Sequence, residues 1–273
     1  MARLTHSPLV SVLMSVHNSA NYLEGALESI IHQTYQNFEF LITDDCSTDE
    51  SPSIILRYAE RDDRIRFFRN EENQGLTKSL NDMLQRAEGD LIARMDADDI
   101  SRLRRFECQV SAFEEEPIPD VVFSNTRLID KNGDLICISW RPSEKQIVDQ
   151  LGQRCYIPHP TVMTRAEAIR GAGGYDESYW TGQDHDLWER MKADGADFRY
   201  LPDVLLDYRL NPDSVRAESS DDYWFEVSNW CIWNQDRWQS LAYLDRLTTW
   251  QRVQILVKMM VPHFVLRYRG QTR

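Results

Sequence analysis

The first 124 residues alternate between short apolar runs and longer amphipathic stretches, and this alternation constrains the fold more than any other feature of the chain. The short runs have the length and β-branched content of strands, and the longer stretches repeat their apolar residues with the period of a helix. Strands separated by helices form βαβ units, so we predict an α/β fold with a mostly parallel central sheet flanked by helices. The predicted strands are 9–16, 38–43, 65–68, 91–95 and 121–124, and the predicted helices are 20–33, 52–60, 76–87 and 102–115.

Three of the predicted strands end in polar residues, at His17, Asp44 and Asp96. Right-handed crossovers bring these ends to one edge of the sheet, which is where open α/β sheets bind their ligands. We therefore expect the functional site at this edge.

The predicted strand at 91–95 runs into three carboxylates, those of Asp96, Asp98 and Asp99. Because side chains alternate along a strand, an Asp-x-Asp sequence points two carboxylates to the same side. Burying unpaired carboxylates costs on the order of several kcal/mol, and a divalent cation with oxygen ligands would remove this cost. A cation that also held a diphosphate would become catalytic. The alternative is a solvated acidic turn that caps the next helix, and the three acids alone do not distinguish the two interpretations.

Composition and charge narrow the classes of partner. The chain has 273 residues, 42% of them hydrophobic, which is enough for one large α/β domain with an extension. Its net charge of −13 argues against a general nucleic-acid binder, because phosphate contacts need clustered Lys and Arg. An anionic ligand would have to be held by a metal ion or by backbone amides.

Cysteine usage indicates a reducing compartment. The five cysteines are widely spaced and form no C-x-x-C pair, so the sequence predicts neither a disulfide framework nor a zinc site. The apolar run near the N-terminus is too short and too polar for a secretion signal, and no stretch reaches the roughly 18 apolar residues that would span a bilayer. We therefore expect a cytoplasmic protein.

The pattern changes twice after residue 126. The segment 127–140 has the pattern of a hairpin with a tight turn at 131–134. From residue 218 two apolar stripes follow at helical spacing, and the first favours packing onto the main domain. The second is flanked by five basic residues and no acids over 251–273, which is typical of a helix at a membrane interface. We predict a C-terminal helical extension at 218–273, with peripheral contact to an anionic membrane through 248–273.

Seven segments together resemble the inverting family 2 glycosyltransferases of bacterial cell-envelope polysaccharide synthesis. Each motif is weak alone, but their order and spacing are specific. The resemblance covers about 8–216 and implies a GT-A (Rossmann-like) domain at 1–217, with a nucleotide-sugar half at about 8–110 and an acceptor half at about 111–217. The segments are VSVLMSVHN (10–18), FEFLITDDCSTD (38–49), NQGLTKSLN (73–81), AEGDLIARMDADD (87–99), HPTVM (159–163), GGYDE (173–177) and QDHDLWER (183–190).

The resemblance implies that the turn after the first strand wraps the donor nucleotide. Val16, His17 and Asn18 would lie against the base or ribose, and His17 stands where the family commonly has tyrosine. We interpret His17 as a stacking or hydrogen-bonding residue, because no second histidine that could share a metal is near it in the sequence. Asp45 would accept a hydrogen bond from the imide N–H of uracil or thymine, and Asp44 would lie near this contact. The alternative is that Asp45 caps the following helix.

Further donor contacts are implied after residue 70. Asn73 and Gly75 fit a turn whose backbone comes close to the ligand. Arg94, two residues before the first of the acids, resembles the donor-site arginine of the family. That arginine could equally form a structural ion pair. Asp96 and Asp98 would hold the ribose and the metal, with Asp98 the first choice as ligand and Mg²⁺ or Mn²⁺ as the ion. These donor residues are Asn73, Gly75, Arg94, Asp96, Ala97 and Asp98.

Asp184 matches the aspartate that serves as the family's catalytic base. Inversion needs one carboxylate to take the proton of the attacking hydroxyl. The alternative is that Asp184 is the N-cap of a helix predicted at 185–194. Tyr175, Tyr179 and Trp180, with Gln183, would form an acceptor wall, for which core packing is the alternative. The HPTVM segment is interpreted as scaffold near the acceptor cleft.

Three positions depart from the family pattern. Gln183 replaces the usual glutamate, Leu103 stands where a proline often follows the acidic turn, and Asn211 replaces a histidine that can help to bind metal or pyrophosphate. Asn211 offers a neutral oxygen ligand at most. Arg209 in the same loop can clamp a phosphate.

The leading hypothesis is a metal-dependent transfer from a UDP-sugar, or secondly a dTDP-sugar, to a glycan or lipid-linked acceptor at the cytoplasmic face of the inner membrane. A sugar nucleotidyltransferase is disfavoured, because no glycine follows the first strand before Gly25. A non-catalytic relative that binds nucleotide or glycan is the alternative that Gln183 and Asn211 motivate. The sequence gives no indication of how many copies of the chain associate.

Overall fold

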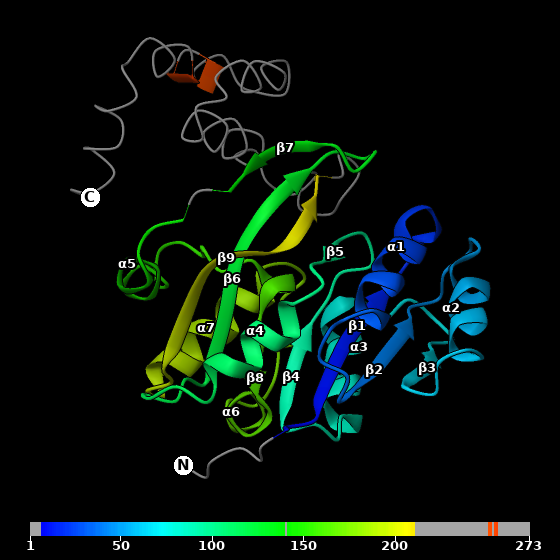
Figure 1. The fold of residues 1–273 in the computed structure, drawn as a ribbon, viewed down its shortest axis with the longest axis horizontal. Coiled ribbons are helices and arrows are strands. Elements are labelled where there is room, and N and C mark those ends of the chain that lie inside the picture. The colour runs from blue at the N-terminus through cyan, green and yellow to red at the C-terminus, as the bar shows by residue number, and fades with distance from the viewer. Residues whose placement is uncertain (1–6, 140, 211–250, 253, 256–273) are drawn as a thin grey trace. The chain divides into compact units, whose positions relative to one another are not determined.

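A computed structural model of the protein describes residues 7–139, 141–210, 251–252 and 254–255 (Figure 1). The contacts within the chain divide it into two units. The first unit consists of Met1–Asn125 and Pro142–Asp207, and the second of Thr126–Arg141 and Tyr208–Arg273. All predicted site residues except Arg209 and Asn211 belong to the first unit.

One half of the central sheet is parallel. β1 (Val10–Val16) lies between β2 (Phe38–Asp44) and β4 (Leu91–Arg94), and β3 (Ile65–Arg69) pairs with the other edge of β2. β2 is buried along its whole length, as a strand covered by helices on both faces should be. The predicted βαβ series is therefore confirmed.

The rest of the sheet contains antiparallel pairs. The strands that follow β4 in the sheet are β8 (Met163–Arg165), β6 (Val121–Ile129), β9 (Phe198–Arg209) and β5 (Ile100–Ser101), while β7 (Leu135–Ile138) pairs with β6. The pairs β4–β8, β6–β8, β6–β7 and β5–β9 are antiparallel. The predicted α/β fold is confirmed, and its sheet is mixed.

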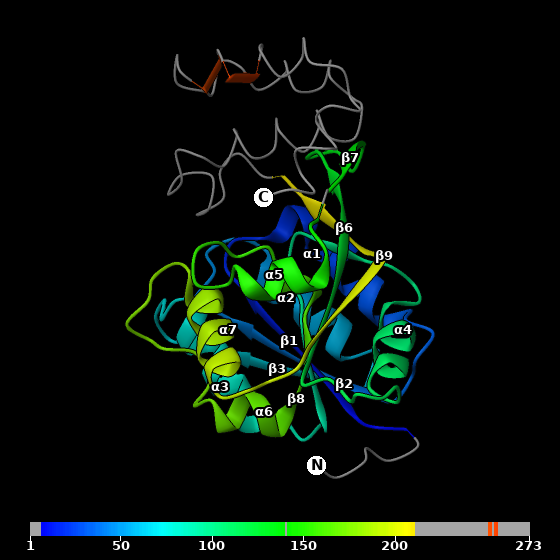
Figure 2. The ribbon, with the colours of Figure 1, turned by 90° about the vertical axis from the view of Figure 1, so that its left-hand side faces the viewer.

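Helices cover both faces of the sheet (Figure 2). Leu13 and Leu41 point to the face where α3, α6 and α7 pack, and they share one core cluster with Leu187 of α7. Phe38 points to the opposite face and meets Phe106 of α4 edge to face. The helices are α1 (Ala20–Ile31), α2 (Ser51–Ala59), α3 (Leu76–Arg86), α4 (Arg105–Ala112), α5 (Glu144–Asp149), α6 (Ala166–Gly171) and α7 (Gln183–Ala193), with a 3₁₀ turn η1 (His159–Thr161).

Three helices begin at other residues than the sequence pattern predicts, and for α2 the difference is a single residue. α4 begins at Arg105 because the short strand β5 occupies the preceding residues, and a turn from Arg102 to Arg105 separates the two elements. α7 begins at Gln183, two residues early, because Gly182 adopts a φ of +77° just before it. Only glycine takes such a left-handed conformation without steric cost.

The predicted hairpin in the second unit is confirmed. The Gly133 amide donates to the Asp130 carbonyl (3.0 Å), and the Asp130 amide donates to the Asp134 carbonyl (2.9 Å). The domain boundary at 217 and nearly all of the predicted extension at 218–273 lie outside the described residues. Within the described part of the chain, no helix is both long and apolar enough to cross a bilayer.

Candidate active site

The strand ends predicted to share an edge do so. Val16 pairs with Asp44 in the parallel register of β1 and β2, and the Asp45 amide donates to the Val16 carbonyl (2.7 Å). On the other side of β1, the Met95 amide donates to the Leu13 carbonyl (3.1 Å). The turns after β1, β2 and β4 therefore emerge together.

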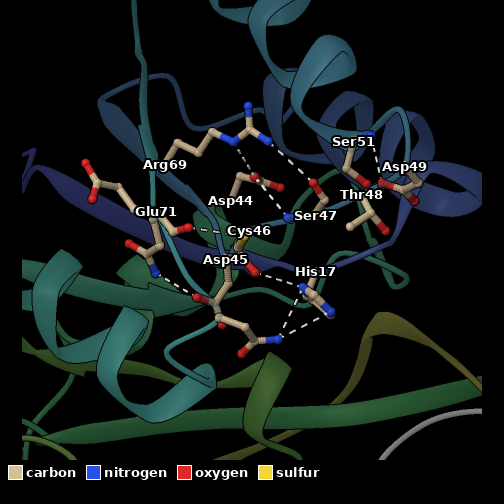
Figure 3. Close-up of polar contacts among 12 residues, drawn as sticks. His17, Asp44, Asp45, Cys46, Ser47, Thr48, Asp49, Ser51, Arg69 and Glu71 are labelled. Carbon is tan, nitrogen blue, oxygen red and sulfur yellow. Dashed lines mark hydrogen bonds and ion pairs between the residues drawn. The ribbon is translucent and has the colours of Figure 1, made fainter.

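Asp45 organises the loop between β3 and α3 (Figure 3). Its Oδ1 accepts from Asn70 Nδ2 (2.7 Å) and from the Gln74 amide (2.8 Å), and its Oδ2 accepts from the Gly75 amide (2.8 Å). The side chain is only 2% exposed. A carboxylate has about four acceptor positions, so these contacts leave one on Oδ2. Asp45 does not cap α2, and its side chain instead holds the loop that contains Asn73 and Gly75, the two residues predicted to approach the donor.

Asp49, rather than Asp45, accepts hydrogen bonds from backbone amides at the starts of two helices. Its Oδ1 accepts from the Ser51 amide at the start of α2 (2.9 Å), and its Oδ2 accepts from the Ala20 amide at the start of α1 (3.0 Å). Burial alone would raise the pKa of Asp49, but the hydrogen bonds from Ser51 and Ala20 lower it overall. The Asn18 amide donates to Ser47 Oγ (2.9 Å), so the turns after β1 and β2 form one connected structure.

His17 has both ring nitrogens occupied. Its Nδ1 lies 2.8 Å from the Asp45 carbonyl, which can only accept, so Nδ1 carries the proton. Nε2 is then the acceptor for the amide groups of Asn18 (3.2 Å) and Asn73 (3.3 Å), whose oxygens accept from the Thr48 and Gly75 amides. Because both ring nitrogens have partners within the protein, His17 would contact a ligand through its ring face, which favours stacking over hydrogen bonding.

Asp44 is fully buried and paired with Arg69. Arg69 Nε lies 3.2 Å from Asp44 Oδ2, which also accepts from the Ser47 amide (3.2 Å). Asp44 Oδ1 has no hydrogen-bond partner among the described residues. The sequence pattern does not single out Arg69, although its position at the end of β3, opposite Asp44 in the register, could have indicated the pair.

The acidic turn after β4 contains both exposed and buried carboxylates. Asp96 and Asp98 are partly exposed, whereas Asp99 is buried. Arg94, 3% exposed, pairs with Asp96 and donates to the Leu13 carbonyl (3.4 Å). The structural ion pair considered for Arg94 is therefore present, on the strand that carries the predicted metal ligands.

A second arginine, Arg105, lies wholly buried behind the acidic turn. Its Nη2 donates to the carbonyls of Arg94 (2.8 Å) and Val162 (3.3 Å), and its Nε donates to Gln109 Oε1 (2.9 Å). Burial lowers the pKa of Arg105 to about 9, against the opposing effect of Asp99. Arg105 thus supplies positive charge beside the acids, which weakens the argument that their repulsion alone requires a metal. The sequence pattern places it inside a helix and gives it no role.

The donor set suits a hard divalent cation. Among the described residues, no group of three or more His, Cys, Asp or Glu side chains is arranged to hold a metal. Asp96 and Asp98 offer oxygen ligands only, which fits Mg²⁺ or Mn²⁺ completing its coordination with substrate phosphates and water.

Asp184 is the second residue of α7, and Gly182 is the N-cap. The interpretation of Asp184 as N-cap is therefore wrong. Its carboxylate still lies in the first turn, where the helix dipole stabilises negative charge. Asp186, in the same turn, forms an ion pair with Arg190 (2.8 Å).

The predicted acceptor wall is divided between core and surface. Tyr175 is 5% exposed and its hydroxyl lies 2.8 Å from His159 Nε2, so core packing, the alternative, describes this residue. Gln183 is also buried. Tyr179 and Trp180 are 44% and 77% exposed. The Tyr179 carbonyl accepts from Thr77 Oγ1 (3.2 Å), which ties this aromatic segment to the start of α3.

Arg209 belongs to the second unit. Its Nη1 donates to the carbonyls of Asp130 (2.9 Å) and Lys131 (3.2 Å), at the turn of the hairpin. Asn211 lies outside the described residues.

The profile of the family described as glycosyl transferase family 2 matches residues 11–169, more than half of the chain. The chain belongs to this family. A relative in Methanocaldococcus jannaschii, an uncharacterized glycosyltransferase, is 30% identical over 270 residues, or 95% of this chain and 92% of that protein. The Escherichia coli UDP-Gal:alpha-D-GlcNAc-diphosphoundecaprenol beta-1,3-galactosyltransferase is 29% identical over 220 residues, or 80% of each chain.

Two solved structures share the fold. Staphylococcus aureus TarS 1-349 in complex with UDP-GlcNAc matches with a TM-score of 0.64 at 20% identity, over 94% of this chain and 72% of that one. The mannosyltransferase PcManGT from Pyrobaculum calidifontis, in complex with GDP-Man and Mn²⁺, matches with a TM-score of 0.64 at 18% identity, over 98% and 81%. The predicted GT-A fold and glycosyltransferase class are confirmed.

Proposed function

We propose that this family 2 glycosyltransferase moves a sugar from a UDP-sugar to a hydroxyl of a glycan or lipid-linked acceptor, with inversion and with Mn²⁺ or Mg²⁺. The observation that carries the proposal is the edge formed by β1, β2 and β4. It presents the ring face of His17 and the partly exposed carboxylates of Asp96 and Asp98. We assign the proton transfer to Asp184, in the first turn of α7.

The nucleotide would be held by the connected turns after β1 and β2. The base stacks on His17 beside Val16 and Asn18, and its imide N–H donates to the acceptor position that remains on Asp45. Asn73 and Gly75 line the same turn. The requirement for an imide N–H selects uracil, or thymine as second choice, over cytosine. The UDP-galactose donor named for the Escherichia coli relative supports this choice.

The diphosphate would be held from the acidic turn. Asp98, with Asp96, would bind the metal ion, which supplies charge neutralisation for the departing diphosphate. Asp96 remains paired with Arg94, which orients it. Contacts of the donor with Ala97, with Arg209 as a phosphate clamp and with Asn211 stay predictions from the sequence.

The transfer is a single displacement at the anomeric carbon. The acceptor oxygen attacks as its proton passes to the Asp184 carboxylate, and the bond from the anomeric carbon to the phosphate oxygen breaks with its electron pair leaving on the nucleoside diphosphate. Asp184 lies in the first turn of α7, where the helix dipole favours the ionised form of a carboxylate.

The exposed rings of Tyr179 and Trp180 suit a carbohydrate acceptor, because sugar faces stack on aromatic rings. The lipid diphosphate acceptor named for the Escherichia coli relative makes a lipid-linked glycan the class we propose. Such an acceptor would bring the protein to the cytoplasmic face of the membrane.

The test is release of nucleoside diphosphate from a panel of UDP-, dTDP- and GDP-sugars, with Mn²⁺ or with EDTA. We expect release from a UDP-sugar that depends on the metal. Asp184→Asn should lower turnover roughly a hundredfold or more while UDP still binds. No release from any donor, together with retained UDP binding, would instead support a non-catalytic binding protein, the alternative that Gln183 motivates.

A further inference from the structure

His159 and Tyr175 form a buried pair that the proposed mechanism does not use. Their side chains are joined by the 2.8 Å contact between His159 Nε2 and the Tyr175 hydroxyl, and their rings meet edge to face at 5.5 Å and 61°. His159 also meets the ring of Trp188 on α7 edge to face, at 6.1 Å and 71°. The two residues come from the HPTVM and GGYDE segments, which are far apart in the sequence.

The pair is uncharged although it lies among the charges of the site. Burial lowers the pKa of His159 well below its usual value, and Arg94 lowers it further. Burial raises the pKa of Tyr175 well above its usual range, with Asp184 and Asp96 adding to this and Arg94 opposing it. The hydrogen bond therefore joins two neutral groups that feel charges from both the donor side and the acceptor side.

His159 is attached to the strand that carries the acids. At the end of η1, the Val162 carbonyl accepts from the Arg94 amide (2.9 Å) and from Arg105 Nη2 (3.3 Å). The Thr161 carbonyl accepts from Gln109 Nε2 (2.7 Å). A displacement of η1 would therefore be transmitted to the end of β4.

Tyr175 is attached to the elements that carry the base. Its amide donates to Asn81 Oδ1 (3.0 Å), and Asn81 Nδ2 donates back to its carbonyl (2.8 Å), which fixes it to α3. Arg190 Nη2 on α7 donates to the neighbouring Gly174 carbonyl (2.8 Å). Trp188, which His159 contacts, lies four residues after Asp184 and so on the same side of α7.

We propose that His159 and Tyr175 are a positioning pair, which sets the place of the first turn of α7, and with it Asp184, relative to the acidic turn after β4. The proposal rests on the proposed function for its catalytic consequence. A displacement of about 1 Å between reacting groups can cost up to roughly a hundredfold in rate, so one buried hydrogen bond between the two halves has a kinetic effect larger than its effect on stability.

The test compares Tyr175→Phe with a matched control. Tyr58→Phe removes the same hydroxyl from another buried tyrosine, which donates to Glu28 Oε1 (2.6 Å) between α2 and α1. Turnover and donor KM are measured with the sugar nucleotide that the unmodified chain consumes fastest. We expect Tyr175→Phe to lower kcat roughly tenfold or more with donor KM within about twofold, and Tyr58→Phe to change neither. His159→Gln, which removes the ring contact with Trp188, should share the kinetic effect of Tyr175→Phe.

Hydrogen exchange provides a readout that needs no activity. We expect amides of 183–187 to exchange faster in Tyr175→Phe than in the unmodified chain, with no change there in Tyr58→Phe. Unchanged exchange in this segment would overturn the positioning role. A kcat loss that Tyr58→Phe shares, or one that only follows a loss of folded protein, would overturn it as well. If the unmodified chain consumes no sugar nucleotide, the proposed function fails, and exchange alone decides whether the pair positions α7.

Discussion

Asp45, Asp49 and Arg105 each connect segments that are distant in the sequence. Asp45 joins the end of β2 to the loop before α3, Asp49 joins the starts of α1 and α2, and Arg105 joins the end of β4 to the segment after η1. Asp45 and Arg105 are buried, and removing one of their hydrogen-bond partners costs about 1 to 3 kcal/mol, because a buried polar group is then left unsatisfied. The rigidity of the site therefore depends on these contacts between distant segments.

Stability should depend on pH through His159. The unfolded chain protonates this histidine near pH 6.5, whereas the folded protein holds it neutral because burial lowers its pKa well below that value. Below pH 6.5 the unfolded state therefore binds the extra proton, and the free energy of unfolding falls as the pH falls. The expected loss between pH 6.5 and pH 5 is about 2 kcal/mol, measured by urea unfolding.

His159→Gln should remove this part of the pH dependence. His32→Gln is the matched control, because His32 is an exposed residue of the α1 C-terminus. Equal slopes of unfolding free energy against pH in the unmodified chain and His159→Gln would contradict a neutral, buried His159.

At the scale of elements, the loop between β3 and α3 depends on one backbone conformation. Gly75 is the N-cap of α3 with a φ of +85°, and its amide donates to Asp45. Gly75→Ala should cost about 1 to 2 kcal/mol and weaken UDP binding, because an alanine strains this conformation and disturbs the amide that Asp45 accepts. Gly171→Ala is the control, since nothing lies within 4 Å of its added Cβ and its φ is not positive. Calorimetry should show weaker UDP binding for the first variant only, and equal affinities would argue against the loop as a donor contact.

The elements themselves follow from the sequence to a large extent. Apolar runs such as Phe38–Asp44 are fully buried strands, and their period and length identify them without tertiary information. The start of α7 does not follow, because cap preferences favour Asp184 over Gly182, and the left-handed conformation of Gly182 is set by the chain on both sides of it.

For the candidate site, the sequence predicts which acidic residues take part but not the contacts that hold them in place. Asp96, Asp98 and Asp184 are carboxylates that can bind a metal ion or accept a proton. The order of their motifs along the chain assigns them to one site. The partners that hold the site, such as Arg105 and the bond between His159 and Tyr175, are contacts across the fold. No local pattern indicates them, because an arginine in a predicted helix is ordinarily solvated.

At the scale of the whole molecule, the sequence predicts a C-terminal segment with its own function. The five basic residues over 251–273, with no acids, contrast with the net charge of −13. We expect the full chain to float with vesicles that contain phosphatidylserine, because basic residues and apolar area add in interfacial binding. A chain that ends at Asp245 should stay in the dense fraction. Equal recovery of both chains with the vesicles would refute a membrane role for the tail.

The proposed function requires that the edge of β1, β2 and β4 binds UDP through a metal ion held by Asp98 and Asp96. Calorimetric titration with UDP tests this binding. The titration is done in Mn²⁺ and in EDTA with the unmodified chain, with Asp98→Asn and with Asp184→Asn. We expect EDTA to weaken UDP binding to the unmodified chain roughly tenfold or more. Asp98→Asn should bind UDP equally weakly in both conditions, and Asp184→Asn should bind UDP as the unmodified chain does. UDP affinity that is the same in Mn²⁺ and EDTA, and unchanged by Asp98→Asn, would contradict it.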